Sequence, residues 1–150
     1  MILYDPSYYN NSSPNLEVES NTVTNAHRHG VVMLARGGNI HDNQIYHVGM
    51  PSKLGCGIAT IGMRVPDGTW EIPQDINVQN NTIMAHTVIT QCGIEVYTAA
   101  QAGVTGKNIS ITRNTIGPMK AAVPNDVRML SSIFIMDGTQ NVTVQNNKLK

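Results

Sequence analysis

The stretch Asn141-Val142-Thr143-Val144-Gln145-Asn146-Asn147-Lys148-Leu149 decides the fold, because the chain repeats it. Its apolar and polar residues alternate, which predicts a strand with Val142 and Val144 on one face. Asn146 and Asn147 predict a corner after the strand, since asparagine tolerates left-handed backbone geometry and bonds to neighbouring peptide groups. Leu149 then points inward again.

Copies of this phrase run through the chain. They cover residues 15–23, 75–83 and 108–116, and a weaker copy over 37–45 keeps Ile40, Asn43 and Ile45. The corner asparagines therefore stand at positions 21, 43, 81, 114 and 147, at intervals of 22 to 38 residues. An internal period of this size predicts a solenoid.

A second strand signal opens with a small residue and occurs once per period, at residues 30–34, 57–61, 93–97 and 132–136. One coil is thus predicted as a strand, an asparagine corner, a short edge, a loop and a glycine-led strand. Stacked coils place equivalent residues in columns about 4.8 Å apart. Ile76, Ile109 and Val142 form one predicted interior column, and the corner asparagines form a hydrogen-bonded ladder that satisfies buried amides.

Length and charge exclude several classes of protein. The 150 residues have room for one domain, predicted as a lead-in segment or partial coil over 1–14 and a β-helix domain over 15–150. Ten basic and ten acidic residues balance, so we expect no nucleic-acid partner. No apolar run is long enough for a membrane span, and the first residues lack the features of a signal peptide.

The repeated pattern Asn-apolar-x-apolar-x-x-Asn-x-apolar over residues 15–149 resembles right-handed parallel β-helix proteins of the pectate-lyase-like superfamily. The resemblance implies an all-β, right-handed, single-stranded parallel β-helix of about 4–5 coils with irregular loop insertions. The long loops make the chain most similar to a segment of a bacteriophage tailspike or appendage protein. That implies a virion-tail or extracellular location, and a homotrimer or stacking on further coils.

The tailspike resemblance implies a module that binds host cell-surface polysaccharide, with hydrolysis left open. Two other functions compete with it. One is a pectate-lyase-like lyase or epimerase, which the neutral charge disfavours because polyuronate binders gain from a basic groove. The other is a structural β-helix segment without an active site of its own. No cofactor is implied.

Two carboxylates are the predicted catalytic pair, because glycoside hydrolysis needs one on each side of the bond. Glu95 is predicted on the outer face of a glycine-led strand, with Val32, Ala59 and Phe134 as column neighbours. Apolar surroundings favour the protonated carboxyl that a general acid requires. Asp137 lies one coil on, at the end of the next strand. The alternative is that Glu95 pairs with an arginine or faces water.

Four residues are the predicted substrate-binding set. The Asp67-Gly68 turn would present Trp70 and Glu71 from a protruding loop, where the indole ring suits stacking on a sugar. Trp70 serves equally well as a cap on the apolar stack or as an intersubunit contact. Tyr97 lies on the outward face of its strand, where apolar side chains predict an interface with the chain's own loops or with another subunit.

The two cysteines are predicted to share a column. Cys56 and Cys92 each precede the glycine of their strand, and His29 and Ser131 occupy the same place in other coils. Stacked buried thiols are the favoured interpretation, and a disulfide between adjacent coils is the alternative. Two cysteines and one histidine fall short of a four-ligand set, so no metal site is expected.

Overall fold

The computed structural model describes residues 2–4, 16–34, 36–48, 55–64, 68, 70–84, 92–97, 105–118 and 132–150. The protein is all-β in this part of the chain, with three five-stranded parallel sheets and one antiparallel pair of short strands. Among the described residues, no helix has the length and apolar character needed to cross a membrane.

The repeated phrase forms one sheet, here called sheet B. Its strands are β2 (Leu16–Glu19), β5 (Arg36–His41), β10 (Gln74–Gln79), β13 (Lys107–Thr112) and β16 (Gln140–Gln145). The short edges after the corners form sheet C, with strands β3 (Thr22–Thr24), β6 (Gln44–Tyr46), β11 (Thr82–Met84), β14 (Thr115–Ile116) and β17 (Lys148–Leu149).

The glycine-led strands belong to the third sheet, sheet A. It consists of β1 (Ile2–Tyr4), β4 (Val31–Leu34), β7 (Cys56–Ile61), β12 (Cys92–Tyr97) and β15 (Ile133–Ile135). Between β7 and β10, the strands β8 (Met63–Arg64) and β9 (Trp70–Glu71) pair antiparallel. Since β1 pairs with β4, the first residues take part in sheet A.

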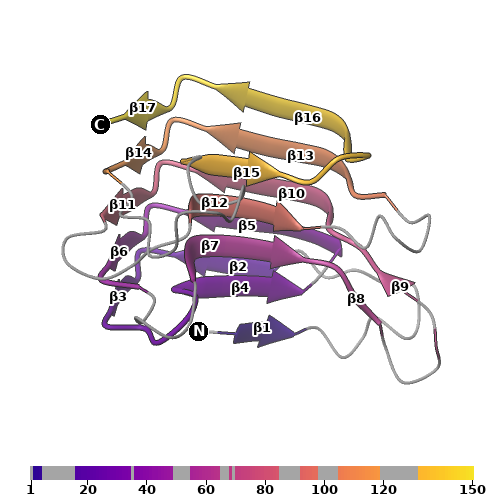
Figure 1. Ribbon diagram of the computed structural model, residues 1–150, viewed down its shortest axis with the longest axis horizontal. Coiled ribbons are helices and arrows are strands. Elements are labelled where there is room, and N and C mark those ends of the chain that lie inside the picture. Colours follow the sequence, from indigo (N-terminus) through magenta and orange to yellow (C-terminus); the bar gives the residue numbers. More distant parts are fainter. Residues whose placement is uncertain are drawn as a thin grey trace, which may run out of the picture.

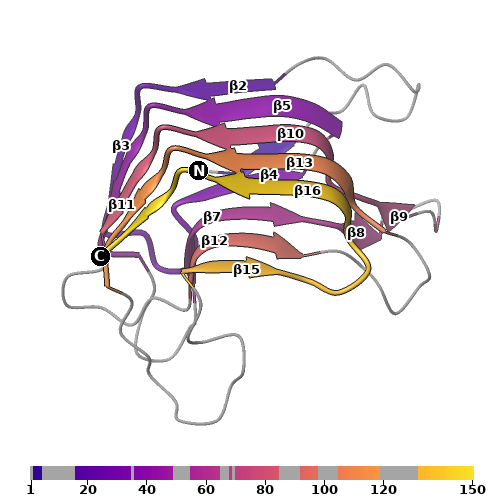
Figure 2. The same cartoon turned by 90° about the horizontal axis from the view of Figure 1, so that it is seen from above.

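The chain visits the sheets in a fixed cycle, B then C then A, and each cycle adds one strand to each sheet. We call one such cycle a coil. Figures 1 and 2 show the coils stacked from indigo to yellow, with the three sheets around a common interior. The predicted columns are confirmed: Ile76 pairs with Ile109, and Ile109 with Val142. The arrangement is compatible with a β-helix solenoid.

The interior is a stack of isoleucine and valine with one methionine. Sheets B and A contribute alternate residues of their strands, and sheet C contributes the second residue of its short strands, such as Ile45, Ile83 and Ile116. The fully buried members of this core are Val31, Met33, Ile40, Ile45, Ile58, Ile76, Val78, Ile83, Ile94, Val96, Ile109, Ile111 and Ile116. At the edge formed by β16 and β17 the same columns emerge, and Val144 and Leu149 are 44% and 61% exposed.

The predicted asparagine ladder is present at the corner between sheets B and C. Each rung receives two hydrogen bonds from the rung before it, as when Asn43 N and Nδ2 donate to Asn81 Oδ1 at 3.1 and 2.9 Å. Asn81 repeats the pattern toward Asn114. Each buried amide also donates to a backbone carbonyl of the preceding coil, and Asn81 Nδ2 lies 2.8 Å from Ile40 O. The ladder therefore links adjacent coils through hydrogen bonds between asparagine side chains and through hydrogen bonds from these side chains to the backbone.

Left-handed residues also stack in columns. The residue before each ladder asparagine has φ between 55° and 58°, at Ser20, Asp42, Asn80, Arg113 and Asn146. The repeated pattern leaves this position open, and serine, aspartate, arginine and asparagine all occur there. The N–H groups of all but Asn146 donate to a carbonyl one coil on, as Asp42 N does to Gln79 O at 3.3 Å. These bonds offset a conformation that costs an L-residue about 1–2 kcal/mol.

A glycine stands at the beginning of β4, β7 and β12 because sheet C approaches closely there. A Cβ on Gly57 or Gly93 would lie 2.4 or 2.5 Å from the Cγ2 atom of Ile83 or Ile116. It would also lie 2.8 or 2.7 Å from the backbone oxygen of Gly93 or Ser132 in the next coil. Only a residue without a Cβ fits at these places, whereas Ser132 takes the equivalent place before the edge strand β15.

Candidate functional site

Glu95 lies in the predicted column on the outer face of sheet A. Its partners across the sheet are Ala59 and Phe134, and Val32 stands opposite Ala59. The carboxylate does not face water, because Glu95 is only 5% exposed and Ala59 is fully buried within a single copy of the chain. This face is therefore covered by the chain itself at this point, and needs no second subunit to exclude solvent.

Asp137 is exposed, in the turn that follows β15. It stands three residues beyond Phe134, the partner of Glu95, and two residues beyond the end of β15. Glu95 is buried whereas Asp137 is exposed, so the two carboxyl groups lie in different surroundings. A catalytic role for Glu95 and Asp137 together stays a prediction.

Two of the predicted binding residues, Trp70 and Tyr97, lie at one end of sheet A. Trp70 is half-buried on β9, opposite Arg64 of β8. Tyr97 ends β12, and its carbonyl oxygen accepts a 2.7 Å hydrogen bond from Gly62 N, just before β8. Figures 1 and 2 show β8 and β9 beyond the arrowheads of β7 and β12. The side chain of Glu71 and the whole of Asp67 lie outside the described residues.

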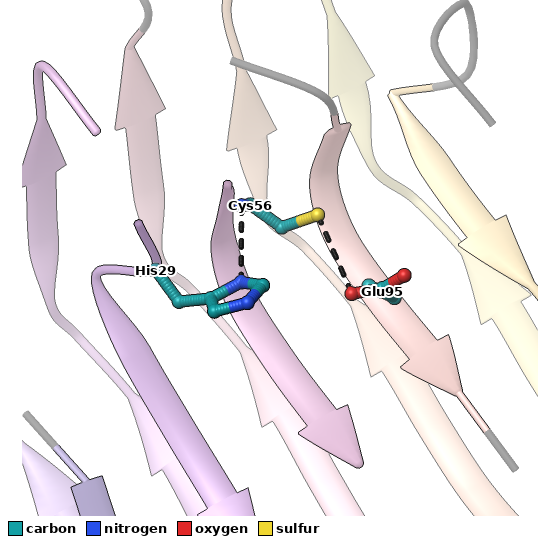
Figure 3. A group of neighbouring side chains, drawn as sticks. All are labelled: His29, Cys56 and Glu95. Carbon is teal, nitrogen blue, oxygen red and sulfur yellow. Dashed lines mark hydrogen bonds between the residues drawn. The ribbon is translucent and has the colours of Figure 1, made fainter. Parts of the chain in front are cut away.

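Cys56 and Cys92 form a disulfide between β7 and β12, so the favoured interpretation of stacked free thiols was wrong and the alternative of a disulfide between adjacent coils is confirmed. Their Cα atoms are 4.7 Å apart and both side chains are fully buried. His29 joins them from the preceding coil, as predicted, and its Nδ1 accepts a 3.2 Å hydrogen bond from Cys56 N (Figure 3). Ser131, the fourth predicted member of the column, lies outside the described residues.

The sulfur atoms lie against the buried carboxylate. Cys56 Sγ is 3.6 Å from Glu95 Oε2 (Figure 3), a contact that is a hydrogen bond only when the cysteine carries a proton. Burial, and secondarily the charge of Arg28, lower the pKa of His29 to about 4, so its ring is neutral at physiological pH. Ligand atoms of His29, Cys56 and Glu95 all lie within 4.8 Å of one another. We call these residues with Cys92 the sulfur cluster.

A second cluster lies on the exposed outer face of sheet B and was missed from the sequence. His41 bonds through Nδ1 to Asp42 Oδ2 at 2.7 Å and through Nε2 to Glu17, while Glu19 Oε2 lies 3.7 Å away. Asp42 first, then Glu17, raise the pKa of His41. Asn39 first, then His41, lower the pKa of Glu17. The register that pairs Glu19 with His41 was the signal that could have revealed this cluster.

The same face carries chains of hydrogen bonds along the stack. Asn77 Nδ2 donates to Asn39 Oδ1 at 2.9 Å, and Asn39 Nδ2 donates to Glu17 Oε2 at 3.0 Å. A parallel chain runs from Asn141 through Asn108 to Asp75, whose pKa the hydrogen bond from Asn108 lowers most. Arg113 binds the side-chain oxygens of Gln79 and Asn80. These fixed donors and acceptors are suited to binding hydroxyl groups.

Comparisons of the chain with protein-family models, with curated proteins and with solved structures found no match.

Proposed function

We propose that the chain is a right-handed, single-stranded parallel β-helix module of a phage tailspike or appendage type that binds host cell-surface polysaccharide. The right hand is supported by the strong preference of crossovers between parallel strands. We place the polysaccharide along the outer face of sheet B, which is exposed, polar and crosses five adjacent strands. The exposed Val144 and Leu149 support stacking on a further coil or, in a homotrimer, contact with another subunit.

The observation that carries this proposal is the hydrogen-bonded order of that face. Glu17, Asn39 and Asn77 form one continuous chain across three coils, so their side chains are held in place before any ligand binds. Immobilising a free polar side chain on binding costs about 0.5–1.5 kcal/mol, and prior ordering removes that cost. Five strands span about 19 Å across the sheet, enough to contact several sugar residues in a row.

The charge on the face favours a neutral polysaccharide. Glu17, Glu19 and Asp42 gather at the β2–β5 edge around a single histidine. An acidic polymer would meet like charges there, which a uronate-binding site avoids. Arg113 is held by two uncharged side-chain oxygens further along the face. This arrangement supports the tailspike-type function over the lyase or epimerase.

Binding is tested by affinity electrophoresis and calorimetry against a panel of neutral and acidic capsular polysaccharides. Asn77→Ala and Arg113→Ala should each weaken binding of the recognised polymer by at least about fivefold, since each removes a fixed donor of about 1 kcal/mol. Thr82→Ala on sheet C is the matched control and should bind normally. Equal affinity in all three variants, or no polymer bound by the parent, would overturn the proposal.

A structural segment without its own site is the second candidate, favoured by one observation. The side chains that order the face bond to neighbouring coils, so the same hydrogen bonds can serve cohesion between coils alone. For that function, Asn77→Ala would lower the free energy of unfolding and no polysaccharide would bind.

Hydrolysis is a separate extension of the proposal. If oligosaccharide release were unchanged in Glu95→Gln, Glu95 would not be the catalytic acid.

A further inference from the structure

The sulfur cluster brings together four side chains of types that bind metals. In the sequence, its first and last members, His29 and Glu95, are 66 residues apart. His29 precedes β4, Cys56 opens β7, and Cys92 and Glu95 lie on β12. The sequence predicted too few ligands for a metal, because only the cysteines and the histidine share a column. The fold adds Glu95, whose carboxylate turns to the same outer face as Cys56 Sγ.

We propose that reduction of the Cys56–Cys92 disulfide converts this cluster into a binding site for a divalent metal ion of the zinc type. The four ligands are a ring nitrogen of His29, Cys56 Sγ, Cys92 Sγ and a carboxylate oxygen of Glu95. Two thiolates, one imidazole and one carboxylate are donor types that zinc accepts in tetrahedral sites. Four protein donors leave no open position, so the site is structural and not catalytic.

The distances suit a tetrahedral ion after a small adjustment. Zinc bonds of 2.0–2.3 Å place neighbouring ligand atoms about 3.3–3.8 Å apart. The 3.6 Å between Cys56 Sγ and Glu95 Oε2 already falls in this range. The widest separation among the donors of His29, Cys56 and Glu95 is at most 4.8 Å, so closure needs about 1 Å. The Cys92 sulfur must move away from Cys56 by more than 1 Å, which bond cleavage allows.

The imidazole of His29 must turn before it can bind the ion. Its Nδ1 accepts from Cys56 N–H, so this lone pair is occupied and Nε2 carries the proton of the neutral ring. Rotation of the ring away from this amide frees a nitrogen lone pair for the ion. His29 is partly exposed, while both cysteines and Glu95 are buried, so the ion would enter from the histidine side.

The reductant of the Cys56–Cys92 disulfide is an external thiol. Two thiol molecules reduce the disulfide to two cysteine thiols and are themselves oxidised to one disulfide. Binding of M²⁺ then releases the two thiol protons to solvent, and the ion is held by two thiolates, a neutral imidazole and a carboxylate. The disulfide links two coils, whereas the ion links three, because His29 belongs to the coil before β7.

The test uses the whole chain and Co²⁺ as a spectroscopic probe. After reduction with excess thiol and its removal under argon, Co²⁺ is titrated and monitored by absorption, with equilibrium dialysis giving the stoichiometry. The expected result is one Co²⁺ per chain, ligand-field bands of a tetrahedral ion and a thiolate-to-cobalt charge-transfer band. Zn²⁺ should abolish the spectrum, and the oxidised chain should not develop it.

Variants assign the ligands. Cys92→Ser should lower the intensity of the thiolate-to-cobalt band, because Cys56 remains as the single sulfur donor. Glu95→Gln and His29→Gln should each weaken binding at least about tenfold, since loss of even an outer-shell partner has such an effect. His41→Gln is the control, because His41 belongs to the other histidine–carboxylate group. Circular dichroism of each reduced variant confirms folding. Folded Glu95→Gln with unchanged affinity, Co²⁺ bound without sulfur bands, or equal binding by the oxidised chain would overturn the proposal.

Discussion

Replacing Asn81 by leucine removes the central rung of the ladder while preserving the size of the side chain. Asn81 Oδ1 accepts from Asn43 N and Nδ2 at 3.1 and 2.9 Å. Its Nδ2 donates to Ile40 O, Gln79 O and Asn114 Oδ1 at 2.8 to 3.0 Å. All five hydrogen bonds are lost in Asn81→Leu, at a corner where Asn81 is 1% exposed.

The expected loss of stability comes from the buried polar groups that lose Asn81 as their hydrogen-bond partner. Asn43 N–H and Ile40 C=O each lose the side-chain partner that Asn81 provides. A buried polar group without its partner costs about 1–3 kcal/mol, and the added apolar surface of leucine offsets part of the sum. We therefore expect the free energy of unfolding to fall by about 2–5 kcal/mol, a large share of the 5–15 kcal/mol typical of a domain.

Urea unfolding followed by far-ultraviolet circular dichroism measures the difference. Asn77→Leu is the matched control, because Asn77 lies on β10 of the same coil but is exposed and makes one side-chain hydrogen bond, to Asn39, so its loss should cost only about 1 kcal/mol or less. Asn21→Leu, at the edge rung, should fall between the two. If Asn81→Leu were as stable as Asn77→Leu, the ladder would not be a source of stability.

Three further predictions concern other features of the stack. Gly93→Ala should destabilise by about 1–3 kcal/mol in the same urea assay, because the new methyl group would lie 2.5 Å from Ile116 Cγ2. Cys92→Ser should lower stability by about 4 kcal/mol under oxidising conditions, the chain-entropy value for a separation of 36 residues. The pKa of His41 is raised in the folded chain, so its contribution to the free energy of unfolding is complete below its ordinary pKa of 6.5 and is lost as the pH rises through the folded value. The pKa of Glu17 is lowered in the folded chain, so its contribution to the free energy of unfolding is complete above its ordinary pKa of 4.5 and is lost in acid. The stability lost in His41→Gln should therefore be greatest between about pH 4.5 and 6.5 and shrink at higher pH.

The interior of the fold could be predicted from sequence because its signals are local. Alternation places Val78 and Ile111 inside, and the next copy of the phrase supplies the register. The irregular intervals did not disturb the columns, since the extra residues fall between strands. The same logic placed Cys56 beside Cys92 and Ala59 beside Glu95.

The outer faces could not be predicted in the same way. The alternation of apolar and polar residues predicts that Glu95 points outward. Its burial depends on which other segments cover that face, and no periodic pattern in the sequence indicates those segments. The His41 cluster requires the spacing between β2 and β5 to be known residue by residue. The proposed metal ligands were not apparent from the sequence for a related reason, because Glu95 lies outside the cysteine column and reaches it only through its side chain.

Binding of polysaccharide to the outer face of sheet B is tested most directly by the side-chain amide resonances of asparagine. Asn39 and Asn77 lie on that face, while Asn43 and Asn81 are buried in the ladder of the same coils. Titration with an oligosaccharide of the recognised polymer should shift the Asn39 and Asn77 amides in a saturable way and leave the ladder amides unchanged. Saturable binding that leaves Asn39 and Asn77 unshifted would contradict the account.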